Sequence, residues 1–187
     1  MLTQGKFIFT PVQYLTQERL ANTRSEYIDG EIFAMAGASR AHNQISSNLV
    51  LSLGNQLFDK PCSVYASDMK VNIATNYVYP DVLVTCEKEQ FADDHTEILL
   101  NPLVIIEILS DTTEAYDRGI KFLNYQFIAS LKIYLLVAQK SCHVEKFIRQ
   151  NNQQWLYTCF HQLDDNIELE TIQCQLPLKE IYRKVQL

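Results

Sequence analysis

Two acidic residues stand beside runs of β-forming residues and could together hold a divalent cation. Asp81 lies between Tyr79-Pro80 and Val82-Leu83-Val84, and Glu107 lies inside the apolar segment Val104 to Leu109. A carboxylate inside an apolar strand is costly to bury unless it is paired, protonated or bound to a metal. If both carboxylates point the same way from neighbouring strands, they could share one cation that activates water and neutralises phosphate charge. That is the chemistry of phosphodiester hydrolysis.

Each acid also has a plainer explanation. Pro-Asp is a common turn pair, so Asp81 could simply end a turn. Glu107 is flanked by isoleucines, which marks a strand interior, and the two acids lie 26 positions apart (107 − 81), enough for two strands and a polar loop. Glu31 follows the turn of a predicted hairpin, where it is either a solvated acid or a third carboxylate that binds metal or orients a water.

Two predicted strands and a helix start carry further polar candidates. His42 near a helix start is a capping or surface residue, or a group that supports the site and contacts phosphate. Asp68 separates two short strands, as a turn residue or as part of the cleft lining. Lys70 alternates with Asp68 and Asn72, which is typical of the solvent-facing side of a strand.

Lys121 and Tyr125 share one face of a predicted helix. Lys121 follows Asp117 by four residues, so the two could form an ion pair on an exposed helix face. Alternatively, its ammonium reaches the cleft and stabilises the phosphate in the transition state. Tyr125 either joins Lys121 in the cleft or is a half-buried aromatic.

Length and composition indicate one globular domain spanning residues 1–187. The chain is 47% hydrophobic and 20% charged, proportions typical of a folded protein with its own core. Its longest apolar run, Ile133 to Ala138, is far shorter than the roughly 20 residues that span a bilayer, so we expect no membrane association. The segment Met1 to Lys6 lacks the pattern of a signal peptide, and we expect a cytoplasmic protein.

The five cysteines and the net charge indicate which kinds of metal site and partner to expect. No Cys-x-x-Cys pair occurs, so we expect reduced thiols, mostly in the core, rather than disulfides or a zinc cluster. The formal charge of −6 disfavours tight, unassisted binding to nucleic acid. It remains compatible with a nuclease whose carboxylates are neutralised by bound metal.

These residues must be positioned by a mixed α/β fold. Thr10-Pro11 predicts a helix start, and Asp29-Gly30 predicts a hairpin over residues 25–35. A helix from Ser39 should bury a stripe that recurs every four residues: Ile45, Leu49, Leu53 and Leu57. We expect strands at 62–66, 69–73, beside Asp81 and around Glu107, and then a helix over 114–129 that buries Ile120, Leu123, Phe127 and Ile128. A strand at 132–138, antiparallel strands at 143–149, 155–160 and 167–169, and a short helix to Tyr182 should complete the fold.

The motifs, taken in order, resemble a known family. They are Asp29-Gly30-Glu31, His42, Ser67 to Val71, Tyr79 to Val82, Val104 to Ser110, Asp117 with Lys121 and Tyr125, and Tyr134 to Val137. Together they resemble the bacterial family of restriction-endonuclease-like proteins often called Uma-type. That family is similar in fold to the PD-(D/E)XK nuclease superfamily, and the resemblance extends from about Val12 to Tyr182.

The resemblance implies a metal-dependent DNA endonuclease with a central mixed sheet of four or five strands flanked by helices. It implies Mg²⁺ or Mn²⁺ as cofactor, Asp81 and Glu107 as ligands with Glu31 assisting, and DNA as substrate, with a homodimer cutting both strands. Leu109 stands where the superfamily carries its catalytic lysine, so Lys121 or Lys70 would have to replace it. That departure leaves a second hypothesis open: a catalytically degenerate nuclease fold acting as an interaction or regulatory module.

Overall fold

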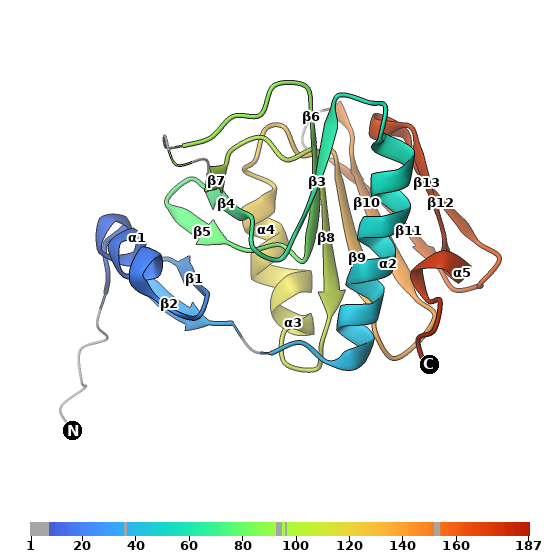
Figure 1. The fold of residues 1–187 in the computed structure, drawn as a ribbon, viewed down its shortest axis with the longest axis horizontal. Coiled ribbons are helices and arrows are strands. Elements are labelled where there is room, and N and C mark those ends of the chain that lie inside the picture. The colour runs from blue at the N-terminus through green and yellow to red at the C-terminus, as the bar shows by residue number, and fades with distance from the viewer. Residues whose placement is uncertain (1–7, 36, 93–94, 96, 152–153) are drawn as a thin grey trace.

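A six-stranded mixed sheet with the order β11-β10-β9-β8-β6-β3 forms the centre of the molecule (Figure 1). In this computed structural model the described residues are 8–35, 37–92, 95, 97–151 and 154–187, so the segment Met1 to Lys6 lies outside them. Only β8 and β9 run parallel, and the other neighbours are antiparallel. The strands are β3 (Cys62–Ala66), β6 (Val82–Cys86), β8 (Val104–Leu109), β9 (Ile133–Ala138), β10 (Val144–Arg149) and β11 (Trp155–Phe160).

A second sheet, in the order β2-β1-β5-β4-β7, is antiparallel except for its β4–β7 pair. Its strands are β1 (Ser25–Ile28), β2 (Glu31–Ala34), β4 (Lys70–Ile73), β5 (Asn76–Val78) and β7 (Ile98–Leu99). The predicted hairpin is confirmed, because Asp29 and Gly30 adopt φ angles of 49° and 90° and link β1 to β2. Two successive positive φ values characterise the tight turns that match strand twist. The predicted first helix is also confirmed as α1 (Pro11–Leu20), capped by Thr10.

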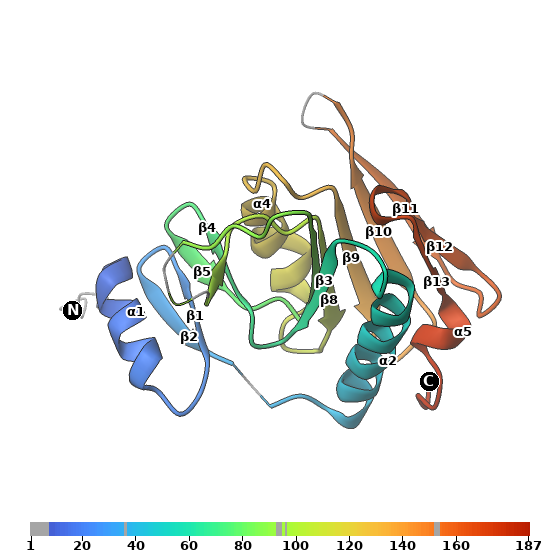
Figure 2. The same ribbon diagram turned by 45° about the horizontal axis from the view of Figure 1, so that its top comes forward.

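The helix α2 (Arg40–Leu57) covers one face of the six-stranded sheet, as predicted. Its apolar stripe is at most 2% exposed and packs against valines and isoleucines of β6, β8 and β9. Beside α2 lie the helix α5 (Leu178–Ile181) and the hairpin of β12 (Asn166–Leu169) and β13 (Cys174–Pro177), joined through the turn η3 (Glu170–Ile172) (Figure 2). The N-terminal α1–β1–β2 unit lies at the opposite end of the molecule.

The segment on the other face of the sheet differs from its prediction. It consists of α3 (Glu114–Tyr116), the π-helical turn η1 (Asp117–Lys121) and α4 (Phe122–Tyr125), and is shorter than predicted. The predicted apolar side is wrong: Ile120, Leu123 and Phe127 are 56%, 61% and 77% exposed, and of the four residues only Ile128 is buried. The buried side carries three polar residues, Asp117, Lys121 and Tyr125. Their partners come from distant strands, which helical periodicity cannot reveal.

The expectation of reduced cysteines is wrong for two of the five. β3 and β6 pair in a register that places Cys62 directly opposite Cys86, and the two form a disulfide. Their separation of 24 residues hides this juxtaposition in the sequence. Of the free cysteines, Cys174 is buried, Cys142 is half-buried and Cys159 is exposed.

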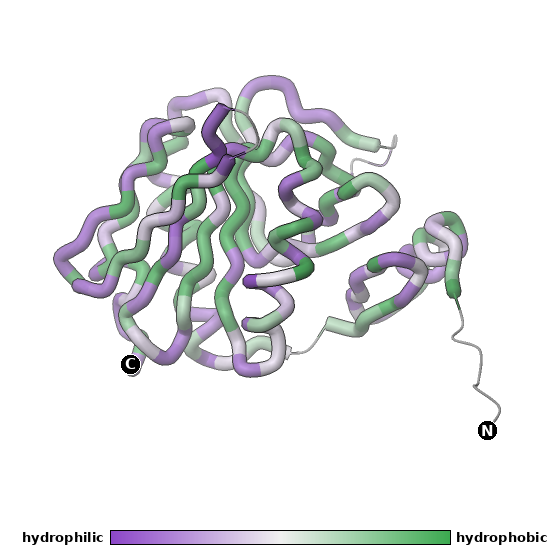
Figure 3. The backbone as a smooth tube through the Cα atoms, turned by 180° about the vertical axis from the view of Figure 1, so that it is seen from behind, coloured by the Kyte–Doolittle hydropathy of each residue, from purple (hydrophilic) through white to green (hydrophobic). Residues whose placement is uncertain are grey.

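The predicted α/β class, with a mixed sheet flanked by helices and extra antiparallel strands toward the C-terminus, is confirmed. β10 and β11 extend the central sheet to six strands rather than forming a separate unit, while β12 and β13 pair on their own. Apolar residues follow the central strands in the view from behind (Figure 3). None of the helices in the described part of the chain is long and apolar enough to cross a membrane.

Candidate active site

Asp81 and Glu107 lie side by side on neighbouring strands. β6 pairs with β8 so that Val82 faces Ile106, which sets Asp81, directly before β6, opposite Glu107. The backbone N–H of Asp81 donates to Glu107 Oε2 at 3.4 Å, and the N–H of Ile108 donates to Asp81 Oδ2 at 2.8 Å. The Glu107 side chain is only 3% exposed, whereas the Asp81 side chain is 18% exposed. One carboxylate is thus buried in the sheet and the other is open to an approaching ligand.

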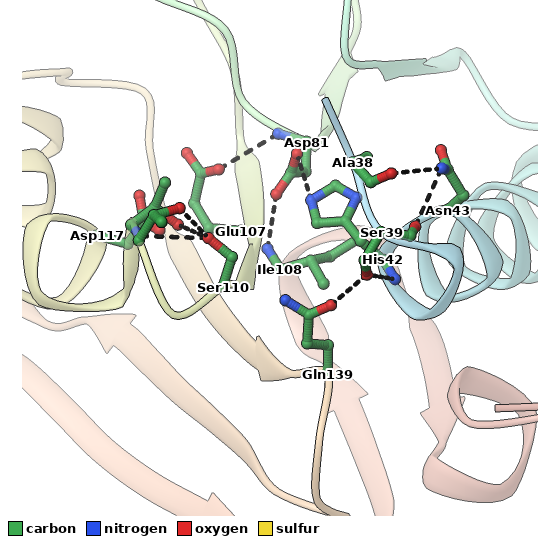
Figure 4. A network of polar contacts seen from close by, with 12 residues as sticks. Ala38, Ser39, His42, Asn43, Asp81, Glu107, Ile108, Ser110, Asp117 and Gln139 are labelled. Atoms are coloured by element: carbon green, nitrogen blue, oxygen red, sulfur yellow. Dashed lines mark hydrogen bonds and ion pairs between the residues drawn. The ribbon is translucent and has the colours of Figure 1, made fainter. Parts of the chain in front are cut away.

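The N-terminal end of α2 brings His42 to Asp81. His42 Nε2 lies 3.1 Å from Asp81 Oδ1, and the capping Ser39 hydroxyl accepts a hydrogen bond from the His42 N–H (Figure 4). Because an ionised carboxylate only accepts hydrogen bonds, Nε2 carries the hydrogen of that contact. His42 Nδ1 is buried and has no hydrogen-bond partner among the described residues. His42 therefore orients one oxygen of Asp81, while Ser39 orients the backbone of His42.

Lys121 occupies the buried centre of a group of carboxylates. Its Nζ lies 2.9 Å from Glu107 Oε1, 3.1 Å from Glu26 Oε1 and 3.6 Å from Asp117 Oδ1. The Lys121 side chain is 7% exposed, so the pair with Asp117 is not the solvent-exposed helix pair that the spacing alone allows. The π-helical turn presents Asp117 and Lys121 to the interior together, and such turns often occur at functional sites.

Hydrogen bonds from tyrosines and backbone hold these acids in place. The Tyr125 hydroxyl donates to Glu107 Oε1 at 2.7 Å, and the N–H of Tyr79 donates to Glu26 Oε1 at 3.1 Å. The Tyr134 hydroxyl donates to the backbone carbonyl of Asp117 at 3.0 Å. Elements from both sheets thus fix one polar cluster, composed of Glu26, Asp81, Glu107, Asp117 and Lys121.

The charges of this cluster oppose one another. Burial disfavours the charged form of Lys121, but the charges of Glu107, Glu26 and Asp117 outweigh it and raise the lysine pKa well above its usual range. Burial raises the pKa of Glu107, and the charges of Asp117 and Asp81 add to it against the opposing effect of Lys121. Burial likewise raises the pKa of Asp117. One ammonium cannot neutralise four carboxylates, and the cluster carries a formal charge of −3 (−4 + 1) when all five groups are ionised.

Two of the sequence candidates, Asp68 and Lys70, contact residues other than those of the polar cluster. Asp68 is a turn residue whose side chain is 79% exposed and lies 3.7 Å from Arg24. Lys70 is buried rather than solvent-facing, with its Nζ 5.5 Å from the ring centres of Tyr14 and Tyr79. Burial lowers the pKa of Lys70, and Glu18 opposes that effect. Glu31 lies opposite Ile28 on the β1–β2 hairpin, nearer the turn than Glu26.

Comparison with known proteins decides the family. A sequence profile named Uma2 and described as "Putative restriction endonuclease" matches residues 11–179. The chain belongs to the Uma2 family. Two proteins of Synechocystis sp., named uncharacterized proteins sll1609 and slr1290, are 37% and 36% identical to it. The first alignment covers 87% of this chain and 92% of the relative, and the second covers 93% and 91%.

A solved structure shares the fold of this Uma2 protein. The crystal structure of a "putative nuclease belonging to DUF820" from Anabaena variabilis superposes with a TM-score of 0.80 and 17% sequence identity. The match covers 95% of this chain and 99% of that one. At that identity the likeness establishes a nuclease-like fold.

The Uma2 chain has the donors for a magnesium-type ion at Asp81 and Glu107. Glu107 Oε2 and both oxygens of Asp81 each have one hydrogen-bonding neighbour, so each keeps a lone pair for a cation. Across the described residues no three His, Cys, Asp or Glu side chains are arranged to hold one ion. Mg²⁺ needs no such set, because it often binds one or two carboxylates and keeps several waters. The net negative charge of the polar cluster also favours a cation.

Two members of the polar cluster, Glu26 and Asp117, were not predicted as site residues from the sequence. Glu26 lies in a strand beside Tyr27 and Ile28, which is the same signal of an acid in an apolar strand that pointed to Glu107. Asp117 precedes Lys121 and Tyr125 at intervals of four residues. That spacing marks a polar face, but an exposed polar face is the commoner explanation.

Proposed function

We propose that this Uma2 protein is a divalent-metal-dependent endonuclease that hydrolyses phosphodiester bonds in DNA. The observation that carries the proposal is the neighbouring pair Asp81 and Glu107 with the buried ammonium of Lys121 2.9 Å from Glu107. Lys121 reaches the acids from η1, so a lysine is present although Leu109 occupies the superfamily's usual lysine position. The family description and the nuclease-like fold support the same reaction class.

The roles of the residues follow from their contacts. Asp81 and Glu107 would hold Mg²⁺ or Mn²⁺, which supplies activation of water and neutralisation of phosphate charge. Lys121 would place a permanent positive charge beside the phosphate and orient the attacking water. His42 positions the Asp81 carboxylate, and Tyr125 positions that of Glu107. Glu26 would assist through its contact with Lys121, and Glu31 on the same hairpin would assist as the family resemblance implies.

A homodimer would let this short chain cut both strands of a duplex, with one site in each subunit. The relevant measurement is the mass of the complex on a short duplex with Ca²⁺ in place of Mg²⁺. A 2:1 complex of protein and DNA supports the arrangement, and a 1:1 complex opposes it.

The direct test is cleavage of supercoiled plasmid with Mg²⁺ or Mn²⁺. We expect wild-type protein to nick or linearise the plasmid and Asp81→Ala to leave it intact. Glu168→Ala, which removes an exposed acid on β12, is the matched control and should cleave normally. Cleavage by Asp81→Ala at the wild-type rate would show that the reaction occurs elsewhere.

A second candidate function is a degenerate nuclease fold that binds metal or a partner without cutting. It is favoured by Leu109 and by the hydrogen bonds that already engage both Asp81 oxygens. Calorimetric titration with Mn²⁺ separates the two functions. Binding that is lost in Glu107→Ala, without cleavage by wild type under either metal, would establish the degenerate form.

A further inference from the structure

Three buried side-chain polar atoms have no hydrogen-bond partner in the described part of the structure: His42 Nδ1, the Tyr116 hydroxyl and Arg149 Nε. The other nitrogens of Arg149 donate to the carbonyls of Gln126 and Ala129, and His42 contacts Asp81 through Nε2. Tyr116 differs from both because its hydroxyl is its only polar side-chain group. Its whole hydrogen-bonding capacity is therefore unused within the described residues.

An unsatisfied buried hydroxyl is unusual, because folding removes it from water without replacing the lost hydrogen bonds. Tyr116 lies at the end of α3, one residue before Asp117. Its ring centre is 5.8 Å from Lys121 Nζ. The unused hydroxyl thus belongs to a residue beside the polar cluster, not to one in a remote part of the core.

The electrostatics of Tyr116 agree with this position. Burial raises the pKa of the phenol, and the charges of Glu26, Glu107 and Asp117 add to that effect against Lys121. The hydroxyl consequently keeps its proton at neutral pH and remains a donor. It donates a hydrogen bond to none of these carboxylates.

We propose that the Tyr116 hydroxyl is a catalytic residue that donates a hydrogen bond to a non-bridging phosphate oxygen of the DNA strand. A phosphate next to Lys121 would bring acceptor oxygens near Tyr116, whose buried hydroxyl has no partner among the described residues. A neutral donor also adds stabilisation without adding charge to the cluster. The inference rests on the proposed function and extends it by naming a phosphate contact outside the acids and the lysine.

The test compares Tyr116→Phe with Tyr182→Phe. Tyr182 is a buried tyrosine outside the polar cluster, and its hydroxyl donates to the carbonyls of Ala138 and His143. In steady-state cleavage of duplex DNA, Tyr116→Phe should lower kcat about tenfold or more, because the contact strengthens as charge develops on phosphate. KM should change less than kcat. Since no internal hydrogen bond is lost, Tm should stay at or above the wild-type value. Tyr182→Phe should lower Tm and leave cleavage unchanged.

Unchanged kcat and KM in Tyr116→Phe would overturn the inference while leaving the nuclease intact. A drop in Tm matching that of Tyr182→Phe would also overturn it, because the hydroxyl would then have a structural partner. If wild type does not cleave, the proposed function fails. The phosphate contact is then tested by comparing the affinities of wild type and Tyr116→Phe for a short DNA duplex in Ca²⁺. Binding about fivefold or more weaker in Tyr116→Phe keeps the phosphate contact, and equal or absent binding by both proteins removes it.

Discussion

The two faces of the six-stranded sheet are covered by helical segments that follow opposite rules. α2 turns its apolar stripe inward, from Ile45 to Leu57, and its polar residues are exposed or half-buried. The segment from α3 to α4 buries Asp117, Lys121 and Tyr125 and exposes Ile120, Leu123 and Phe127. The two segments pack against opposite faces of the same strands. The face toward α3 and α4 carries Glu107 and Tyr134, which bind Lys121 and Asp117.

The two faces of the sheet differ in how burial contributes to stability. Burial of apolar area stabilises the α2 face directly. On the other face, burying charged groups costs free energy that only close partners offset, and Glu26, Glu107 and Asp117 provide them for Lys121. The polar cluster lies beside two candidate metal ligands, and burying it costs free energy. Stability alone therefore does not explain why the cluster is present.

The largest expected effect comes from removing the ammonium group of Lys121 from the polar cluster. Lys121→Met should lower the cleavage rate about 10²-fold or more, the scale for losing one oriented electrostatic contact in a transition state. It should also cost about 3–5 kcal/mol of stability at neutral pH, because the carboxylates lose their buried partner. Cleavage rates at saturating Mg²⁺ and urea unfolding measure the two effects.

Lys132→Met is the control for that change, because Lys132 is an exposed lysine at the end of the same connection. It should alter neither rate nor stability. A Lys121→Met protein that is destabilised but cleaves normally would make the polar cluster purely structural, and would transfer the catalytic lysine role to Lys70.

Changes on the α2 face should lower stability without changing the cleavage rate. Leu49→Ala removes a fully buried side chain from the α2 stripe and should cost about 2–5 kcal/mol of stability. Once corrected for the folded fraction, its cleavage rate should equal that of wild type. Leu51→Ala on the same helix, where the leucine is 56% exposed, should be nearly neutral in urea unfolding. Equal costs at both positions would contradict the assignment of the stripe.

The same contrast explains how much could be predicted from the sequence. The α2 stripe and the Asp29-Gly30 hairpin follow from local patterns, and both are confirmed. The neighbouring placement of Asp81 and Glu107 was also predictable, since two β-forming runs separated by a loop favour antiparallel pairing. Local rules suffice where burial is apolar or where a turn demands particular φ angles.

Long-range pairing accounts for what the sequence concealed. Lys121 is buried because Glu26 meets it from a strand 95 residues earlier in the chain (121 − 26), and no helical pattern records that partner. In the helix over 114–129, apolar periodicity therefore selected the wrong face. The Cys62–Cys86 disulfide likewise depends on the register of β3 with β6.

The stability of the metal-free protein should depend on pH through Glu107 in the polar cluster. Because the pKa of Glu107 is raised on folding, the folded state binds more protons than the unfolded chain above the ordinary value of 4.5. Stability should therefore decrease as pH rises from about 4.5 toward the folded pKa, by about 1.4 kcal/mol for each unit by which that pKa is raised. Tm measured in EDTA from pH 5 to 8 tests this, with Glu107→Gln expected to flatten the slope. Added Mg²⁺ should reverse part of the loss, and parallel profiles for both proteins would exclude Glu107 as its source.

The smallest effect is expected at the exposed apolar residues of the α3–α4 segment. The adjacent residues Phe127 and Ile128 offer a direct comparison. Phe127→Ser changes a side chain that is 77% exposed and should alter stability by no more than about 0.5 kcal/mol. Ile128→Ser changes its neighbour, which is 6% exposed and packs in the core between the two sheets. That change should cost about 3 kcal/mol, because it leaves a cavity and buries a hydroxyl. Urea unfolding of both variants measures the difference. A large cost at Phe127 with little at Ile128 would mean that the segment buries its apolar side after all, and Lys121 would then face solvent instead of Glu107.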